Sequence, residues 1–257
     1  MLSLAELKSL HKLFNKRELV LLLSHMRAYT SLTGHIFGSN PEIEGYYEMH
    51  KGYFSWKSLY HAKLLYYTSH PVKPSAKHLF DKVLHSEHYV APELLNRKDI
   101  NAVFSIRQPE DTILSIVSHY QKVDAKHDYC SPEYAANYYI ERVNSLAELS
   151  GKITTDFIYF DAEAIKDDTQ ALLKFLSEKL ALETPLSPQY QKMKQTGSRF
   201  SGDSSAELFS GRIQQQSKVR EHSIEISKDL LVPAKDAYLN AREVIIGNAK
   251  NNVFTVG

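Results

Sequence analysis

The stretch Glu18–Ser31, with the sequence ELVLLLSHMRAYTS, decides how this chain is expected to fold. Its first part, Glu18–Leu23, is a nearly continuous apolar run, which is typical of a strand buried on both faces of a parallel sheet. Residues Thr30–Phe37 predict a helix that ends at Gly38–Pro41. A helix that begins directly after such a strand presents unpaired N–H groups, which attract a phosphate group.

Three side chains strengthen this prediction of an anion site. Arg27 adds a permanent positive charge with a forked set of donors, and Thr30 and Ser31 add hydroxyl groups. The alternative is an ordinary strand-to-helix turn with a surface arginine. The Walker pattern G-x-x-x-x-G-K-[ST] is absent from the chain, which argues against an ATPase or a GTPase.

Strand and helix patterns continue to alternate along the chain. Further strands are expected at 78–84, 100–106 and 157–160, and further helices at 109–121, 133–149 and 169–180. This alternation predicts an α/β fold, a P-loop-like three-layer arrangement in which helices flank a central parallel sheet. Beyond Thr184 the pattern weakens, and an irregular part with polar helices at 213–230 and 234–246 is expected. We expect one domain over 1–257, with a core at about 18–212 and a helical extension at about 213–257.

Composition excludes several classes of protein. The 257 residues include 31 basic and 30 acidic side chains, so a generic nucleic-acid binder is not expected. The single cysteine, Cys130, cannot form an intrachain disulfide, which suits a reducing compartment. The first residues are too polar for a signal peptide, and Leu19–Leu23 is too short to span a bilayer. We therefore expect a cytoplasmic protein without a membrane span.

A second candidate anion site follows the strand at 100–106. Arg107 lies at the carboxyl end of that strand, where open α/β sheets bind their ligands. Pro109 and the acidic Asp111 suit the first turn of the next helix. Ser115 falls opposite the apolar face of that helix, so it is either solvated or binds a second phosphate together with Arg107.

These two segments resemble the two nucleotide motifs of sulfotransferases that use PAPS (3′-phosphoadenosine 5′-phosphosulfate). The pattern R-x-P-x-D-x-x-x-S is similar to the 3′-phosphate motif of that family and consists of Arg107, Pro109, Asp111 and Ser115. Arg27 stands where the 5′-phosphosulfate loop of the family has a lysine or an arginine, and Thr30 and Ser31 match its paired hydroxyl residues. Ala28 and Tyr29 replace its usual small Ser-Gly pair.

Two later segments agree with the resemblance, which covers about 19–212 and is closest to bacterial-type members. Residues 157–165 and 172–180 are similar to a strand, an acidic loop and a helix of the family. The segment 197–212 is similar to its C-terminal nucleotide loop, in which the resemblance implies that Arg199 and Gly202 contact the nucleotide.

The resemblance implies transfer of a sulfuryl group from PAPS to an acceptor hydroxyl, on a carbohydrate or another small molecule. It implies that Arg27, helped by Lys82, stabilises the leaving oxygen. Three general bases are candidates: Glu48 first, His85 second and His50 third. Two other readings stay open: a non-catalytic nucleotide-binding protein of the same fold, and a P-loop-like kinase.

Two further patterns favour simpler interpretations. The segment His85–His88 lacks the HExxH pattern, and no Cys/His cluster completes a site, so no metal is expected. The aromatic residues between 46 and 67 are mostly expected to form helix core, although Tyr47 and Tyr53 are also candidates for the cleft. The residues expected in this core are Tyr53, Trp56, Tyr60 and Leu64.

Overall fold

The computed structural model describes residues 17–45, 49–70, 73–193, 206–214 and 224–256. Its centre is a parallel sheet of six strands in the order β2-β3-β1-β4-β5-β6. The strands are β1 (Glu18–Leu23), β2 (Ile43–Glu44), β3 (His78–Val83), β4 (Ile100–Ile106), β5 (Ile158–Asp161) and β6 (Val253–Phe254). The predicted α/β fold with a central parallel sheet is therefore confirmed.

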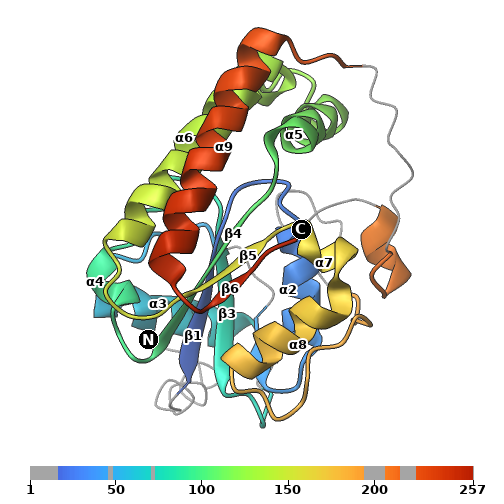
Figure 1. The fold of residues 1–257 in the computed structure, drawn as a ribbon. Helices are drawn as coiled ribbons and strands as arrows, with labels where there is room; N and C mark the ends of the chain where they lie inside the picture. Colours follow the sequence, from blue (N-terminus) through green and yellow to red (C-terminus); the bar gives the residue numbers. More distant parts are fainter. Residues whose placement is uncertain (1–16, 46–48, 71–72, 194–205, 215–223, 257) are drawn as a thin grey trace, which may run out of the picture.

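Helices cover both faces of the sheet (Figure 1). They are α2 (Thr30–Ser39), α3 (Trp56–Ser69), α4 (Pro92–Leu95), α5 (Pro109–Val123), α6 (Pro132–Gly151), α7 (Ala164–Asp167), α8 (Thr169–Lys179) and α9 (Lys228–Ala249). Helices α2, α7 and α8 lie on one side, and the long helices α6 and α9 run side by side on the other (Figure 1). Among the described helices, none has the length and apolar character that a membrane crossing requires.

Strand β1 contributes side chains to the hydrophobic core on both faces of the sheet, because alternate side chains of a strand point to opposite faces. Leu21 and Leu23 belong to the cluster that includes Val143 of α6 and Ile245 of α9. Val20 and Leu22 belong to the other cluster, with side chains from the helices α2 and α8: Ile36, Phe37, Leu172 and Leu176. The apolar run at 18–23 thus forms an interior strand of the sheet, which is the middle one of the three layers.

The aromatic segment before β3 packs differently from the expectation. The predicted helix forms as α3, but Trp56 and Tyr60 are 56% and 49% exposed, so their assignment to the core is wrong. The buried stripe of α3 is instead formed by Leu59, Ala62 and Tyr66. Helical spacing alone did not indicate which side of this aromatic helix meets the sheet.

The C-terminal part also differs from the expectation. One helix, α9, runs from Lys228 to Ala249 and contains Pro233, so the helix expected at 234–246 starts earlier. The described residues of the expected helix at 213–230 are not helical before Lys228, and 215–223 lie outside the described part. Strand β6 then joins the sheet beside β5. This strand was not predicted, because a two-residue strand has no readable period.

A buried carboxylate at the end of β5 fastens this C-terminal part to the sheet. Asp161 is 2% exposed and forms a bidentate ion pair with Arg242 of α9, at 2.8 and 2.7 Å. It also accepts hydrogen bonds from the Tyr159 hydroxyl (2.6 Å) and the Val256 N–H (3.1 Å). These contacts tie α9, β5 and the segment after β6 to one anion.

We expect Arg242→Ala to lower the free energy of unfolding by about 2–4 kcal/mol, because it leaves the buried Asp161 carboxylate without its counter-ion. Urea unfolding followed by circular dichroism measures this change. Lys174→Ala is the control, since the exposed pair of Lys174 and Glu178 contributes less than about 0.5 kcal/mol. Equal effects of the two substitutions would contradict the role of Asp161.

Candidate functional site

The two predicted anion-binding segments follow neighbouring strands of the sheet. Strands β1 and β4 pair in parallel with Leu23 opposite Phe104, so the loops after them open at the same edge. The chain then leaves β1 toward α2 on one face and leaves β4 toward α5 on the other, because α2 and α5 pack into different core clusters. Such a divergence of two neighbouring connections is the place where open α/β sheets bind ligands.

Buried polar contacts hold the loop Ser24–Tyr29 in place. The Ser24 hydroxyl donates to the Ser105 carbonyl of β4 (2.6 Å). Arg142 of α6 donates to the carbonyls of Ser24 (2.9 Å) and Val83 (2.8 Å), and burial lowers its pKa to about 10. The Met26 N–H donates to the Tyr138 hydroxyl (2.9 Å). These contacts anchor the loop to β3, β4 and α6.

A buried histidine links this loop to the second segment. The Nε2 atom of His25 accepts a hydrogen bond from the Arg107 N–H (2.9 Å), so its proton resides on Nδ1, which faces the Met26 carbonyl at 2.9 Å. His25 is fully buried, and burial lowers its pKa to about 3. The Tyr139 hydroxyl donates to the Arg107 carbonyl (2.6 Å) and fixes the other side of the same residue.

The N-terminus of α2 presents its backbone donors at this site. Arg27 and Tyr29 adopt left-handed backbone conformations, with φ of 64° and 55°. Tyr29 is the N-cap residue, and no side chain caps the helix there. The first turn carries the buried Thr30 and the half-buried Ser31, and the Lys82 ammonium donates to the Ser31 hydroxyl (3.3 Å). An uncapped N-terminus with nearby cations suits an anion.

Direct contacts join the two predicted segments. The Arg27 Nε donates to the Ser115 hydroxyl (2.9 Å), and the Arg107 Nη1 donates to the Arg27 carbonyl (3.1 Å). The Arg107 Nη2 pairs with Asp111 (3.1 Å), whereas its Nε is buried without a hydrogen-bond partner among the described residues. Ser115 is buried, so it faces this site rather than solvent.

A group of imidazole rings lies beside the loop at the end of β3. The His85 ring is 5.5 Å from the Tyr138 ring and 6.0 Å from the His88 ring, and His50 lies 5.7 Å from His88. Lys82 contacts α2 and His85 contacts α6, so the two lie on different sides of the sheet edge. Tyr138 connects this group to the loop, because its hydroxyl meets both Met26 and the Leu84 carbonyl (2.8 Å).

Some predicted site residues are placed and others are not. Arg27, Thr30, Ser31, Arg107 and Ser115 lie together at the ends of β1 and β4. Ala28 is buried in the loop between them, and Tyr29 packs on Arg107. The remaining predicted residues, Glu48, Tyr47, Arg199 and Gly202, lie outside the described part of the chain.

Three residues of this site were not predicted from the sequence. His25 lies in the loop Ser24–Tyr29, but the adjacent residues in the sequence do not indicate that it is buried. Arg142 occupies the apolar stripe of α6 beside Tyr139 and Val143, and a charge in such a stripe is a readable signal. Lys166 of α7, whose ammonium lies 4.9 Å from the centre of the Tyr29 ring, has no such signal.

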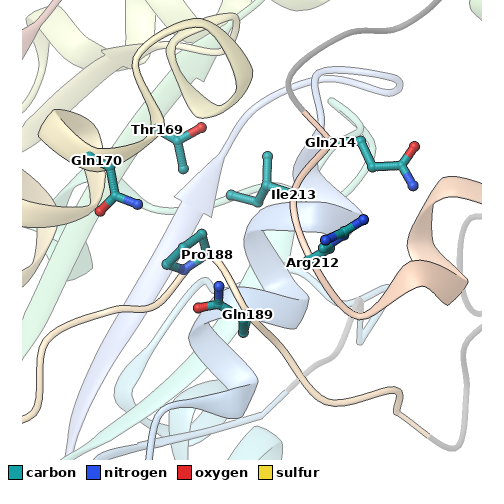
Figure 2. Close-up of a pocket in the computed structure, with 7 residues that line it drawn as sticks. All are labelled: Thr169, Gln170, Pro188, Gln189, Arg212, Ile213 and Gln214. Carbon is teal, nitrogen blue, oxygen red and sulfur yellow. The ribbon is translucent and has the colours of Figure 1, made fainter.

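A polar cavity of about 430 Å³ lies between the start of α8 and two later segments (Figure 2). Its walls come from α8, from the loop after α8 and from the segment after the short helix η2 (Ala206–Ser210). The lining residues are Thr169, Gln170, Pro188, Gln189, Arg212, Ile213 and Gln214. Thr169 is three residues beyond Lys166, so the cavity begins close to the site along the chain.

Comparison with known proteins supports the fold. No family model and no curated protein matches the sequence. A sulfotransferase domain from the curacin biosynthetic pathway has a similar structure, with a TM-score of 0.59 and 12% identity over 88% of this chain and 97% of that domain. This chain therefore shares its fold with a sulfotransferase domain.

Two structures of retinol dehydratase show a weaker likeness. One contains androsterone and the inactive cofactor PAP and is 13% identical, and the other contains retinol and PAP and is 12% identical. Each match covers 96% of this chain and 86% of the other, with a TM-score of 0.36. At that score the likeness adds nothing to the argument for the fold.

We expect the His25 imidazole to stay neutral between pH 8 and pH 4.5, because burial opposes its charged form. NMR of the ring protons, assigned with a His25→Gln variant, should show no titration of the His25 ring in this range. The lowered pKa contributes stability that is fully present above about pH 6.5 and is lost as the pH falls toward 3. A His25 midpoint near 6.5 would contradict this assignment.

Proposed function

We propose that this chain transfers a sulfuryl group from PAPS to the hydroxyl of an acceptor. The observation that supports this most directly is the hydrogen bond from the Arg27 Nε to the Ser115 hydroxyl (2.9 Å), which joins the two segments that were predicted to bind anions. A donor with negative groups at both ends of its nucleoside fits such a site. The fold shared with a sulfotransferase domain favours the same reaction.

The residues present fit the two charged ends of the donor. In our proposal the 5′-phosphosulfate group binds at the N-terminus of α2, where Thr30, Ser31 and the backbone of Ala28 and Tyr29 face it. The 3′-phosphate binds to Arg107 and Ser115. The Arg107 Nε supports this assignment, because a buried donor without a partner in the described structure is costly unless a ligand completes its bonding.

We propose that the adenine enters the polar cavity of Figure 2. Amide side chains from Gln170, Gln189 and Gln214 border the cavity, and amides can donate to and accept from the edge of a purine. Arg199 and Gly202 remain proposed nucleotide contacts from the resemblance of their segment to a nucleotide loop. No metal ligand is part of this proposal.

PAPS supplies a sulfuryl group that is already bonded to a phosphate leaving group. Arg27 and Lys82 stabilise the negative charge that develops on the bridging oxygen as the sulfur–oxygen bond breaks. His85 takes the proton of the acceptor hydroxyl as its oxygen bonds to sulfur, and PAP leaves with the electron pair of the broken bond. We favour His85 because its ring packs on Tyr138, whose hydroxyl meets the backbone N–H just before Arg27.

We propose a carbohydrate as the acceptor. The backbone bridge between Tyr53 and Val90 places the segments that carry His50 and His85 side by side. Next to that bridge, Phe54 and Tyr89 are 65% and 56% exposed. Exposed aromatic faces beside candidate bases suit the apolar face of a sugar ring, and also a phenol, so a transfer screen with labelled sulfate must include both classes.

We expect PAP, the product of the donor, to raise the melting temperature by mass action and to do so more than ATP with Mg²⁺. Arg107→Ala should abolish this shift, because it removes the proposed 3′-phosphate contact. Arg97→Ala is the control, since Arg97 is an exposed arginine that also pairs with an aspartate, Asp99. A larger shift with ATP would favour a kinase, and PAP binding without transfer would favour a non-catalytic nucleotide-binding protein.

We expect His85→Asn to lower kcat by about 10²–10⁴-fold, the usual contribution of one general base, with unchanged PAP affinity. Steady-state transfer assays and calorimetric PAP titration measure the two effects. His61→Asn on α3 is the control, since His61 is exposed and does not belong to the cluster of His50, His85 and His88. Normal activity in His85→Asn together with loss in Glu48→Gln or His50→Asn would reassign the base.

A further inference from the structure

Two buried cations from different elements share one aromatic ring at this site. The Arg107 guanidinium carbon lies 4.3 Å from the centre of the Tyr29 ring, and the Lys166 ammonium lies 4.9 Å from the same point. Arg107 and Lys166 are only 8% and 7% exposed. Because like charges repel more strongly away from water, the attraction of each cation to the negative π-system of the ring helps to hold both at this site.

The backbone at Tyr29 is strained where this contact forms. Its φ of 55° lies in the left-handed region, which a bulky side chain rarely adopts. The Arg107 Nε, buried without a partner among the described residues, is a second local cost. Costs that accumulate at one place in a fold are typical of ligand-binding sites, where binding offsets them.

Carboxylates around Tyr29 and Arg107 oppose the binding of a phosphate at this place, so a second positive charge beside Arg107 would favour it. Burial raises the pKa of the Tyr29 hydroxyl, and the negative charges of Glu163, Asp111 and Asp167 raise it further, although Arg107 opposes them. Asp111 also pairs directly with Arg107. These groups weaken the attraction that Arg107 alone exerts on a phosphate, and the charge of Lys166 restores it.

We infer that Lys166 is a binding residue for the 3′-phosphate of the nucleotide and that Tyr29 is the positioning residue that holds it beside Arg107. The inference rests on the proposed function and adds to it the origin of nucleotide specificity. The site selects adenosine 3′,5′-bisphosphate over adenosine 5′-phosphate because Lys166 and Arg107 act together on the additional phosphate group.

Calorimetric titration of the full chain with PAP and with adenosine 5′-phosphate tests this inference. Lys166→Met should weaken PAP binding by about tenfold, the usual effect of losing one charge-assisted contact, and should weaken adenosine 5′-phosphate binding by less than about twofold. Lys166→Arg keeps the charge and should retain most of the selectivity. Lys179→Met is the matched control: Lys179 also lies over an aromatic ring, 5.6 Å from the centre of Phe175, and should leave the selectivity unchanged.

The ring is tested separately from the charge. Tyr29→Leu keeps a bulky residue at the same backbone position but removes the aromatic face, so the selectivity should fall although Lys166 is present. Tyr29→Phe retains the face and should restore the selectivity. Thermal melting of each ligand-free variant separates a loss of folding from a loss of binding.

The outcomes distinguish the inference from the function on which it rests. If Lys166→Met weakens both nucleotides equally, or neither, the role of Lys166 is overturned while the PAP selectivity of the wild-type protein still supports the proposed function. If the wild-type protein binds PAP no more tightly than adenosine 5′-phosphate, the proposed function fails and the inference fails with it.

Discussion

The parallel pairing of β1 with β4 is the constraint on which the site depends. The register that sets Leu23 opposite Phe104 makes both strands end at the same edge of the sheet. The residues that follow them, Arg27 and Arg107, then meet although 80 positions separate them. Each strand is held by side chains buried on both of its faces, so the position of the site depends on the whole hydrophobic core.

The cations of the site are supported by neutral and carbonyl groups. His25 accepts from the Arg107 N–H in its neutral form, and Tyr139 donates to the Arg107 carbonyl. Arg142 donates hydrogen bonds to the carbonyls of Ser24 and Val83. This arrangement fixes the backbone of both loops through uncharged partners and a buried arginine, while the Arg107 guanidinium keeps its ion pair with Asp111.

Tyr29 departs from the small residues that a tight loop before a helix normally prefers, and the structure gives this departure a physical meaning. The backbone of Tyr29 is in the strained left-handed conformation, and its ring packs against Arg107 and Lys166. The end of β5 reaches the same region, since α7 follows it directly and carries Lys166. Three successive strand ends, those of β1, β4 and β5, therefore contribute to one electrostatic environment.

The sequence alone determined the features that arise from local patterns. The apolar run at 18–23 predicted a central strand, and the alternation after it predicted the layered parallel sheet, because burial on two faces requires an unbroken hydrophobic stretch. Arg27 and Arg107 were found as candidates because each lies between a predicted strand and the helix that follows it. Short strands such as β2 and β6 and the exposed side of α3 were not predictable, since two residues have no period and Trp56 looks apolar in any setting.

Only the tertiary structure decided which of the candidate residues act together. The helix pattern left Ser115 either solvated or at a second phosphate site with Arg107, and the packing of α5 turns its hydroxyl toward Arg27. Lys166 and His25 carry no local signal, because their roles come from neighbours more than 80 positions away in the chain. Hydrophobic periodicity is a property of adjacent residues, whereas the contacts of an anion site form between strand ends that meet only after the sheet has assembled.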